Sequence, residues 1–265
     1  MARSLPSFAR LTALSGALLV LALAPMRSAG AQSQPTYRLL FIGNSYTRFN
    51  LMPSVVQRAL ESLRDPPEVQ VEMIAHPGWT LHRHWNVPST RREIETGHFS
   101  HVVLQGHSLA ALEHPVELQH AVHQFHDVIQ HTGARTVLYE TWARQPGAPD
   151  AAAPPEEMRE RVATAYGSLA MELHALLAPA GAAFELANRA LPELSLQRSD
   201  GSHPTPEGSY LAAITIASAV SGRDPREIRY RTHPMTRQTA SALQEAAARA
   251  LGRGPRRREE PTPRR

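Results

Sequence analysis

The sequence contains no cysteine and no lysine. Without cysteine the chain can form no disulfide bond, offers no thiolate nucleophile and cannot bind zinc through sulfur. Its stability in an oxidising compartment would therefore have to come from packing of the core. All 28 basic side chains are arginines, a usage typical of GC-rich bacterial genomes.

No apolar run is long enough to span a membrane, and a segment near the N-terminus comes closest to that length. Residues 11–24 (LTALSGALLVLALA) follow Arg3 and Arg10 and precede the small-residue pattern AGA at 29–31. This order is typical of a secretory signal peptide, and the run is too short for a comfortable membrane span. We expect cleavage near Ala31 and export to the periplasm or the extracellular space, with no membrane span afterwards. The alternative is an N-terminal anchor that is not cleaved.

The excess of positive charge lies at the two ends of the chain. Residues 1–31 carry three arginines and no acidic residue, and residues 253–265 carry six arginines and two glutamates. The intervening residues 32–252 have a formal net charge of −3, so we expect no nucleic-acid partner for them. We expect the tail to be disordered, and either to touch anionic envelope polymers or to have no role.

Residues 32–252 alternate strand-like and helix-like segments without internal repeats, and they suffice for one α/β domain. Strands are predicted over 37–43, 68–75, 99–105, 135–141 and, on a weaker pattern, 182–186. Helices are predicted over 51–63, 115–131, 155–177, 206–221 and 236–251. This alternation is typical of a parallel sheet with helices on both faces.

Three polar or glycine positions follow predicted strands. Ser45, Gly78 and Gln105 each lie at or just after a strand's carboxyl end. Ligands of doubly wound folds gather at this edge of the sheet, so we expect the three residues to converge there. The motif GNS at 43–45 has, taken alone, the simpler interpretation of an ordinary strand-to-loop turn.

A candidate base for the serine lies near the C-terminus, in the stretch DGSH at 200–203. A serine hydroxyl needs a base, and the base is typically a histidine oriented by a carboxylate. Asp200 and His203 are three residues apart in a loop before a predicted helix, close enough to pair. We therefore predict Ser45 as nucleophile, His203 as general base and acid, and Asp200 as the orienting carboxylate. The alternative is a polar loop without catalytic role.

Acyl transfer also needs hydrogen-bond donors for the oxyanion. The backbone N–H groups of Ser45 and Gly78 are candidates, since a residue without a side chain lets the backbone approach a substrate. The side-chain amide of Gln105 is the third candidate.

In the order GNS, Gly, Gln and Asp-x-x-His, these four segments resemble the SGNH (GDSL-like) hydrolase superfamily. The resemblance extends to about residue 221. It implies a three-layer α/β/α sandwich with about five parallel strands in flavodoxin-like order, and it implies the same roles for the residues named above. The chain departs from the usual motif at Asn44, where Asp is common, and at Gln105, where Asn is usual. The phrases LQGHS and YETWA are similar to a secreted bacterial subgroup in which Gln replaces that Asn.

Other residues near the predicted rim are candidates for a substrate pocket: Asn44, His76, Trp79, His107 and Trp142. For each histidine, the alternative to a pocket role is packing or hydrogen bonding at the rim. For each tryptophan, the alternative is burial in the core. Glu140 has no assigned role.

The fourteen histidines raise the question of a metal site. His120, His123 and His126 share a predicted helix, and His82 and His84 are two residues apart. Histidines at i and i+3 can share a metal, but no known zinc motif is present, so a solvated helix face is the simpler interpretation.

Together these patterns predict an exported serine esterase without metal or cofactor. The expected substrate is a small-molecule or carbohydrate ester, with a small acyl group on a sugar favoured. The alternatives are a non-catalytic glycan-binding protein on the same fold and a metal-dependent hydrolase that uses the histidine-rich helix.

Overall fold

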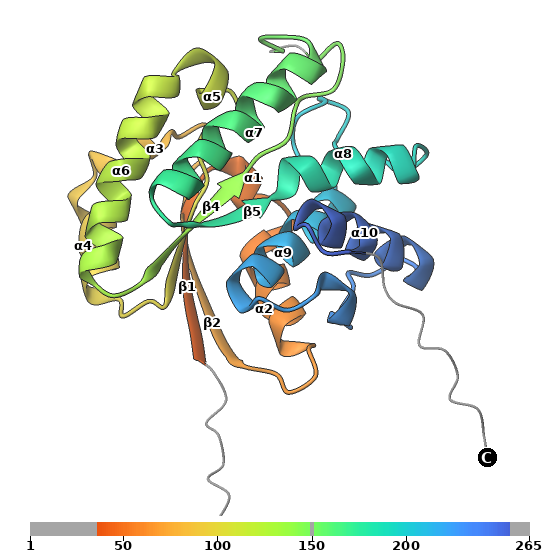
Figure 1. The fold of residues 1–265 in the computed structure, drawn as a ribbon, viewed down its shortest axis with the longest axis horizontal. Coiled ribbons are helices and arrows are strands. Elements are labelled where there is room, and N and C mark those ends of the chain that lie inside the picture. Colours follow the sequence, from red (N-terminus) through yellow and green to blue (C-terminus); the bar gives the residue numbers. More distant parts are fainter. Residues whose placement is uncertain (1–35, 149–150, 255–265) are drawn as a thin grey trace, which may run out of the picture. The chain divides into compact units, whose positions relative to one another are not determined.

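A five-stranded parallel sheet organises the computed structural model, which describes residues 36–148 and 151–254 (Figure 1). The order across the sheet is β2-β1-β3-β4-β5, with every neighbouring pair parallel. The predicted α/β/α sandwich with flavodoxin-like order is therefore confirmed. The strands are β1 (Thr36–Gly43), β2 (Glu68–Ala75), β3 (His101–Leu104), β4 (Arg135–Glu140) and β5 (Leu176–Pro179).

Helices cover both faces of the sheet (Figure 1). The core on one face contains residues of α2, α8, α9 and α10, and the core on the other contains residues of the helices from α3 to α7. The helices are α1 (Ser45–Arg48), η1 (Phe49–Leu51), α2 (Met52–Glu61), α3 (Leu81–Trp85), α4 (Pro88–Thr96), α5 (Ala110–Glu113), α6 (Pro115–His131), α7 (Pro155–Glu172), α8 (Ala180–Ala190), α9 (Pro206–Ser221), η2 (Pro225–Glu227) and α10 (Arg237–Ala250).

The continuous apolar run of β1 follows from this layering. Leu39 and Phe41 point into the core on the α9 side, and Leu40 and Ile42 into the core on the α6 side. All four are completely buried, because a central parallel strand has no solvent face.

The strand register brings the predicted site segments to one edge of the sheet. Gly43, the last residue of β1, pairs with Ala75 of β2, and Ile42 pairs with Leu104 of β3. The segments that follow these three strands therefore leave the sheet at neighbouring points.

The weakest strand prediction was wrong. Residues 182–186 lie inside α8, and the fifth strand is β5, whose first two residues fall at the end of the helix predicted over 155–177. That helix ends at Glu172. The apolar pattern of 182–186 belongs to an alanine-rich helix whose buried residues follow the helical spacing i, i+3, i+4, i+7. These residues are Ala180, Ala183, Phe184 and Ala187.

The chain around Ser45 is more helical than predicted. The helix predicted over 51–63 corresponds to α2, but α1 and η1 precede it, and Ser45 is the first residue of α1. Asn44 is the N-cap residue, and its side chain accepts a hydrogen bond from the Tyr46 N–H. Ser45 is half-buried at this helix start.

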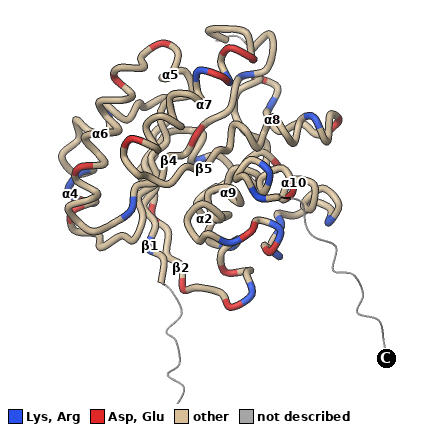
Figure 2. The backbone as a smooth tube through the Cα atoms, viewed as in Figure 1, with Lys and Arg blue, Asp and Glu red and all other residues tan. Residues whose placement is uncertain are grey.

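The predicted signal peptide, residues 1–31, and nearly all of the tail 253–265 lie outside the described residues. In the part of the chain that is described, every helix is too short or too polar to cross a membrane. Basic and acidic positions are interspersed along it (Figure 2).

Candidate active site

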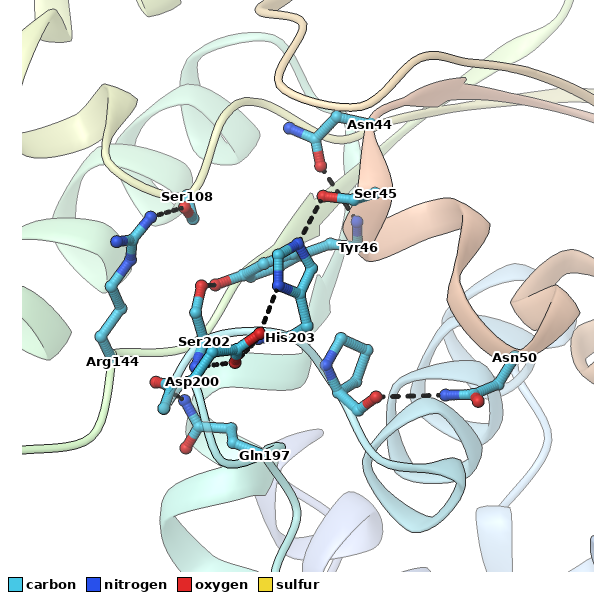
Figure 3. Close-up of polar contacts among 12 residues, drawn as sticks. Asn44, Ser45, Tyr46, Asn50, Ser108, Arg144, Gln197, Asp200, Ser202 and His203 are labelled. Carbon is cyan, nitrogen blue, oxygen red and sulfur yellow. Dashed lines mark hydrogen bonds and ion pairs between the residues drawn. The ribbon is translucent and has the colours of Figure 1, made fainter. Parts of the chain in front are cut away.

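Ser45, His203 and Asp200 form a continuous chain of hydrogen bonds (Figure 3). The Ser45 Oγ lies 2.9 Å from His203 Nε2, and His203 Nδ1 lies 2.8 Å from Asp200 Oδ2. An ionised carboxylate only accepts hydrogen bonds, so Nδ1 carries the proton and Nε2 is left to accept the serine hydroxyl. The structure thus brings together the three residues predicted as a triad.

The Asp200 carboxylate is held by its own loop. Its Oδ1 accepts the backbone N–H groups of Ser202 and His203, each at 2.9 Å. Burial by itself raises the pKa of Asp200, but these hydrogen bonds and the one from the His203 ring outweigh it, and the pKa lies below its ordinary value. The carboxylate is therefore in the charged form that orients the imidazole.

The loop that carries His203 is closed on itself. Gln197 and Pro204 form an antiparallel bridge, and the Arg198 N–H donates to the His203 carbonyl at 2.8 Å. The Gln197 side chain donates to the Gly201 carbonyl at 2.9 Å. These bonds hold the loop that carries the imidazole in one conformation.

Gln105 holds the turn that presents Ser45. Its Oε1 accepts the Asn44 N–H at 3.0 Å and the Thr47 hydroxyl at 2.9 Å, and its Nε2 donates to the Gly106 carbonyl. A backbone N–H can only donate, so the Asn44 contact decides which end of the amide faces the turn. Gln105 is completely buried. The oxyanion role expected for it stays a prediction, and the observed contacts tie it to the nucleophile turn.

Glycine is required at position 43 because the side chains of Thr47 and Gln105 come close to the backbone there. A Cβ atom at this position would lie 2.4 Å from Thr47 Oγ1 and 2.6 Å from Gln105 Oε1. Glycine leaves the space in which the two side chains meet above the end of β1.

Gly78 lies in a turn closed by a hydrogen bond from the Trp79 N–H to the His76 carbonyl at 3.1 Å. Its φ is +72°, and Pro77 precedes it, as in a type II turn, where glycine is favoured at this position. A Cβ atom here would meet nothing within 4 Å. The glycine is therefore required by backbone conformation, and it faces open space.

The Gly78 turn is linked to the nucleophile turn. The Asn44 side-chain amide donates to the Trp79 carbonyl at 3.2 Å. The ring of Trp79 packs against His76 and against His84, whose Nε2 lies 2.7 Å from the Gly43 carbonyl. Burial lowers the pKa of His84 to about 4, so its ring is neutral and donates through Nε2.

An aromatic stack joins α1, the helix that begins at Ser45, to the loop that carries His203, which we call the histidine loop. Trp142 lies between Tyr46 and Phe184, with nearly parallel rings and centroid distances of 4.6 and 4.0 Å. The Tyr46 hydroxyl lies 2.7 Å from Ser202 Oγ, and Trp142 Nε1 donates to the Ser202 carbonyl at 3.0 Å. Trp142 is almost completely buried, so it acts in packing.

Two residues missed by sequence reasoning border His203. The Phe49 ring lies 4.7 Å from the His203 ring, and the Asn50 amide donates to the Pro204 carbonyl at 3.2 Å. Phe49 also lines an open hollow of about 290 Å³ together with Ser45, Arg48 and Pro77. Phe49 and Asn50 lie four and five residues after Ser45, and this proximity in the sequence was the available signal.

Comparison with known proteins relates the chain as a whole to a superfamily. Neither a model of a protein family nor a curated protein matches the sequence. Among solved structures, a Slackia heliotrinireducens protein assigned to the SGNH hydrolases is 28% identical; the match spans 70% of this chain and 100% of that one, with a TM-score of 0.61. The chain belongs to the SGNH hydrolase superfamily.

More distant structures share the SGNH fold. A DUF4886 family protein from Bacteroides uniformis is 18% identical, and the match spans 82% of this chain and 95% of that one, with a TM-score of 0.62. An acetyl-xylooligosaccharide esterase from Geobacillus is 15% identical, with corresponding shares of 77% and 99% and a TM-score of 0.53.

Among the described residues, no hydrogen bond joins His107 or Glu140 of this SGNH protein to the triad. His107 follows β3, and burial lowers its pKa. Glu140 ends β4, where its carboxylate accepts the Ala182 N–H at 3.1 Å. Burial raises the pKa of Glu140 to about 7.

Within residues 36–148 and 151–254, no group of three or more acidic or histidine side chains could hold a metal ion. On α6, His123 Nε2 lies 3.3 Å from a Glu172 oxygen, and His126 bonds to the Thr136 hydroxyl at 3.0 Å. His82 Nε2 lies 2.9 Å from the Asn86 amide. The histidines considered for metal binding are thus individually engaged or, like His120, exposed.

Proposed function

We propose that this SGNH protein is an exported serine esterase that cleaves carboxylic esters through an acyl-enzyme on Ser45. The observation that carries the proposal is the hydrogen-bond chain from Ser45 through His203 to Asp200, with distances of 2.9 and 2.8 Å. The signal-peptide pattern before Ala31 supports export.

In the first half-reaction, His203 Nε2 takes the proton of Ser45 as Oγ attacks the ester carbonyl. The Asp200 carboxylate stabilises the imidazolium that forms. His203 then gives this proton to the leaving alcohol as the carbon–oxygen bond breaks. In the second half-reaction, His203 activates a water molecule that releases the acid from Ser45.

The oxyanion of each tetrahedral intermediate would be bound by the backbone N–H groups of Ser45 and Gly78. Neither group donates a hydrogen bond to a residue of the described chain, which leaves both available to a substrate oxygen. We assign to Gln105 a positioning role, because its amide bonds to the nucleophile turn and its side chain is completely buried.

A small acyl group on a carbohydrate is the substrate class that the site fits best. The hollow beside Ser45 is open and measures about 290 Å³, with Phe49 and Pro77 as apolar lining. Two of the proteins with a similar fold are an acetyl-xylooligosaccharide esterase and an acetyl xylan esterase.

The test is labelling of the mature protein with a fluorophosphonate, together with hydrolysis of p-nitrophenyl acetate. We expect labelling and hydrolysis in the parent and in Ser89→Ala, which removes an exposed hydroxyl on α4, and neither in Ser45→Ala. Absence of labelling with an intact fold would favour the glycan-binding alternative. Loss of activity on addition of a chelator would favour a metal-dependent hydrolase.

A further inference from the structure

A row of exposed arginines extends from the nucleophile over neighbouring surface hollows. We call Arg48, Arg58, Arg229, Arg231 and Arg237 the arginine track; all five are exposed. They line four hollows, the first of which is the one beside Ser45.

The hollows adjoin one another along the chain. The hollow beside Ser45 ends at Phe49, and the next, of about 280 Å³, begins at Asn50 and contains Arg58 and Tyr230. Tyr230 also lines the two that follow, of about 410 and 400 Å³, which both contain Arg229 and Arg231.

A strained connection joins the first two hollows. Asn50 and Leu51 are consecutive non-glycine residues with φ of +54° and +52°, a conformation that costs free energy. The Asn50 amide stabilises it through bonds to the Pro204 carbonyl and to Ser209 Oγ, at 3.2 and 2.8 Å. Figure 3 shows Asn50 reaching from the nucleophile side toward the histidine loop. The segment before α2 is thereby tied to the histidine loop and to α9, and Arg58, farther along α2, lines the second hollow.

The charge of the track is not neutralised by the protein. None of the residues that line the four hollows is acidic. Elsewhere arginines pair with carboxylates, for example Arg159 with Glu185 and Arg226 with Asp224, but among the described residues no track arginine has such a partner. The contrast is marked because residues 32–252 carry a net charge of −3.

Other contacts orient the track arginines without pairing them with a carboxylate. The Arg58 guanidinium lies 5.8 Å from the centre of the Tyr230 ring, and Arg231 Nε donates to the Met235 carbonyl at 3.0 Å. Phe49 and Tyr230 add aromatic faces to the same hollows, and such faces suit the apolar face of a sugar ring.

We propose that the arginine track binds an anionic polysaccharide, whose charged sugars lie along the hollows while an O-acyl group enters the site at Ser45. This inference rests on the proposed esterase function and adds the class of substrate. A row of unpaired cations that begins at the nucleophile fits a polymer with repeated carboxylates better than a neutral one.

Binding to the Ser45→Ala protein tests the track independently of catalysis. The probes are polygalacturonate and single-stranded DNA at matched charge concentration, and uncharged arabinoxylan at the same sugar concentration as polygalacturonate. The test variant Arg58→Gln/Arg229→Gln/Arg231→Gln keeps polar side chains but removes three charges. The control Arg92→Gln/Arg161→Gln/Arg189→Gln removes three exposed charges from α4, α7 and α8.

We expect Ser45→Ala to bind polygalacturonate more tightly than the other two probes. The test variant should weaken this binding about tenfold, the control variant should not, and 0.5 M NaCl should remove most of the difference between the variants. Equal affinity for polygalacturonate and arabinoxylan, DNA binding as tight as polygalacturonate binding, or equal loss in both variants would overturn the proposal.

Turnover separates this inference from the esterase proposal. The parent should have a higher kcat/KM on acetylated polygalacturonate than on acetylated xylan, and the test variant should lower that ratio while the control variant preserves it. Polygalacturonate binding without any ester cleavage would refute the esterase and retain the track. Cleavage with a ratio of one would retain the esterase and refute the track.

Discussion

Gln105 Oε1 lies 3.0 Å from the backbone nitrogen of Asn44, the residue that immediately precedes the nucleophile. The same oxygen accepts the hydroxyl of Thr47, so one buried amide fixes both sides of Ser45. The geometry of the triad therefore depends on a residue that does not touch it.

Gln105→Met is expected to reduce both stability and turnover. It keeps the side-chain volume but leaves the buried Asn44 N–H without an acceptor, which costs about 1–3 kcal/mol in the free energy of unfolding. Urea unfolding and kinetics with p-nitrophenyl acetate measure the two effects, and we expect kcat to fall more than KM rises. A large fall in kcat with unchanged stability would instead indicate that Gln105 donates to the oxyanion.

Gly43→Ala is expected to destabilise the protein by about 1–3 kcal/mol through overpacking. The new methyl group would overlap Thr47 Oγ1 and Gln105 Oε1, and both of these side chains are buried. Gly167→Ala, at a position where a Cβ meets nothing within 4 Å, is the matched control. Equal unfolding midpoints for the two variants would contradict the packing described at the end of β1.

Asp200→Asn is expected to lower kcat by about 10³–10⁴-fold. An amide nitrogen opposite His203 Nδ1 favours the tautomer in which Nδ1 accepts, and Nε2 then carries the proton and cannot take one from Ser45. The loop should stay folded, because Oδ1 of Asn can still accept the N–H groups of Ser202 and His203. Activity within tenfold of the parent would argue against this carboxylate as the orienting group.

Glu140 is expected to make stability depend on pH. Burial raises its pKa from 4.5 to about 7 in the folded protein. Between these values the folded state binds more protons than the unfolded state, so the free energy of unfolding falls as pH rises from about 4.5 to about 7 and stays low above it. The contribution is about 3 kcal/mol.

Glu140→Gln should remove this pH dependence while keeping an acceptor for the Ala182 N–H. Urea unfolding at pH 5 and pH 8 measures it, and the variant should gain stability relative to the parent mainly at pH 8. A difference between variant and parent that is the same at both pH values would show that Glu140 titrates normally.

Much of the active site could be predicted because its chemistry depends on residue type and spacing. Ser45 after a buried strand and Asp200 three residues before His203 were sufficient to propose the triad, and the strand–helix alternation was sufficient for the sheet. The role of Gln105 could not be predicted, since the side chain alone does not tell which way its amide points.

Other features depend on packing that the sequence pattern does not reveal. The alanine-rich segment of α8 resembles a short strand when read in isolation, and α1 has only four residues, too few for a periodic signal. The arginine track combines one residue of α1 and one of α2 with residues 229–237, and these segments meet only in the folded chain.

Intact-mass spectrometry of the acid-quenched reaction with p-nitrophenyl acetate tests the central claim most directly. The account predicts a transient adduct with the mass of one acetyl group, which fragmentation locates on Ser45. The adduct should be absent from Ser45→Ala and from heat-denatured protein. Rapid hydrolysis without an adduct on Ser45, or an adduct on another residue, would contradict an acyl-enzyme mechanism at this serine.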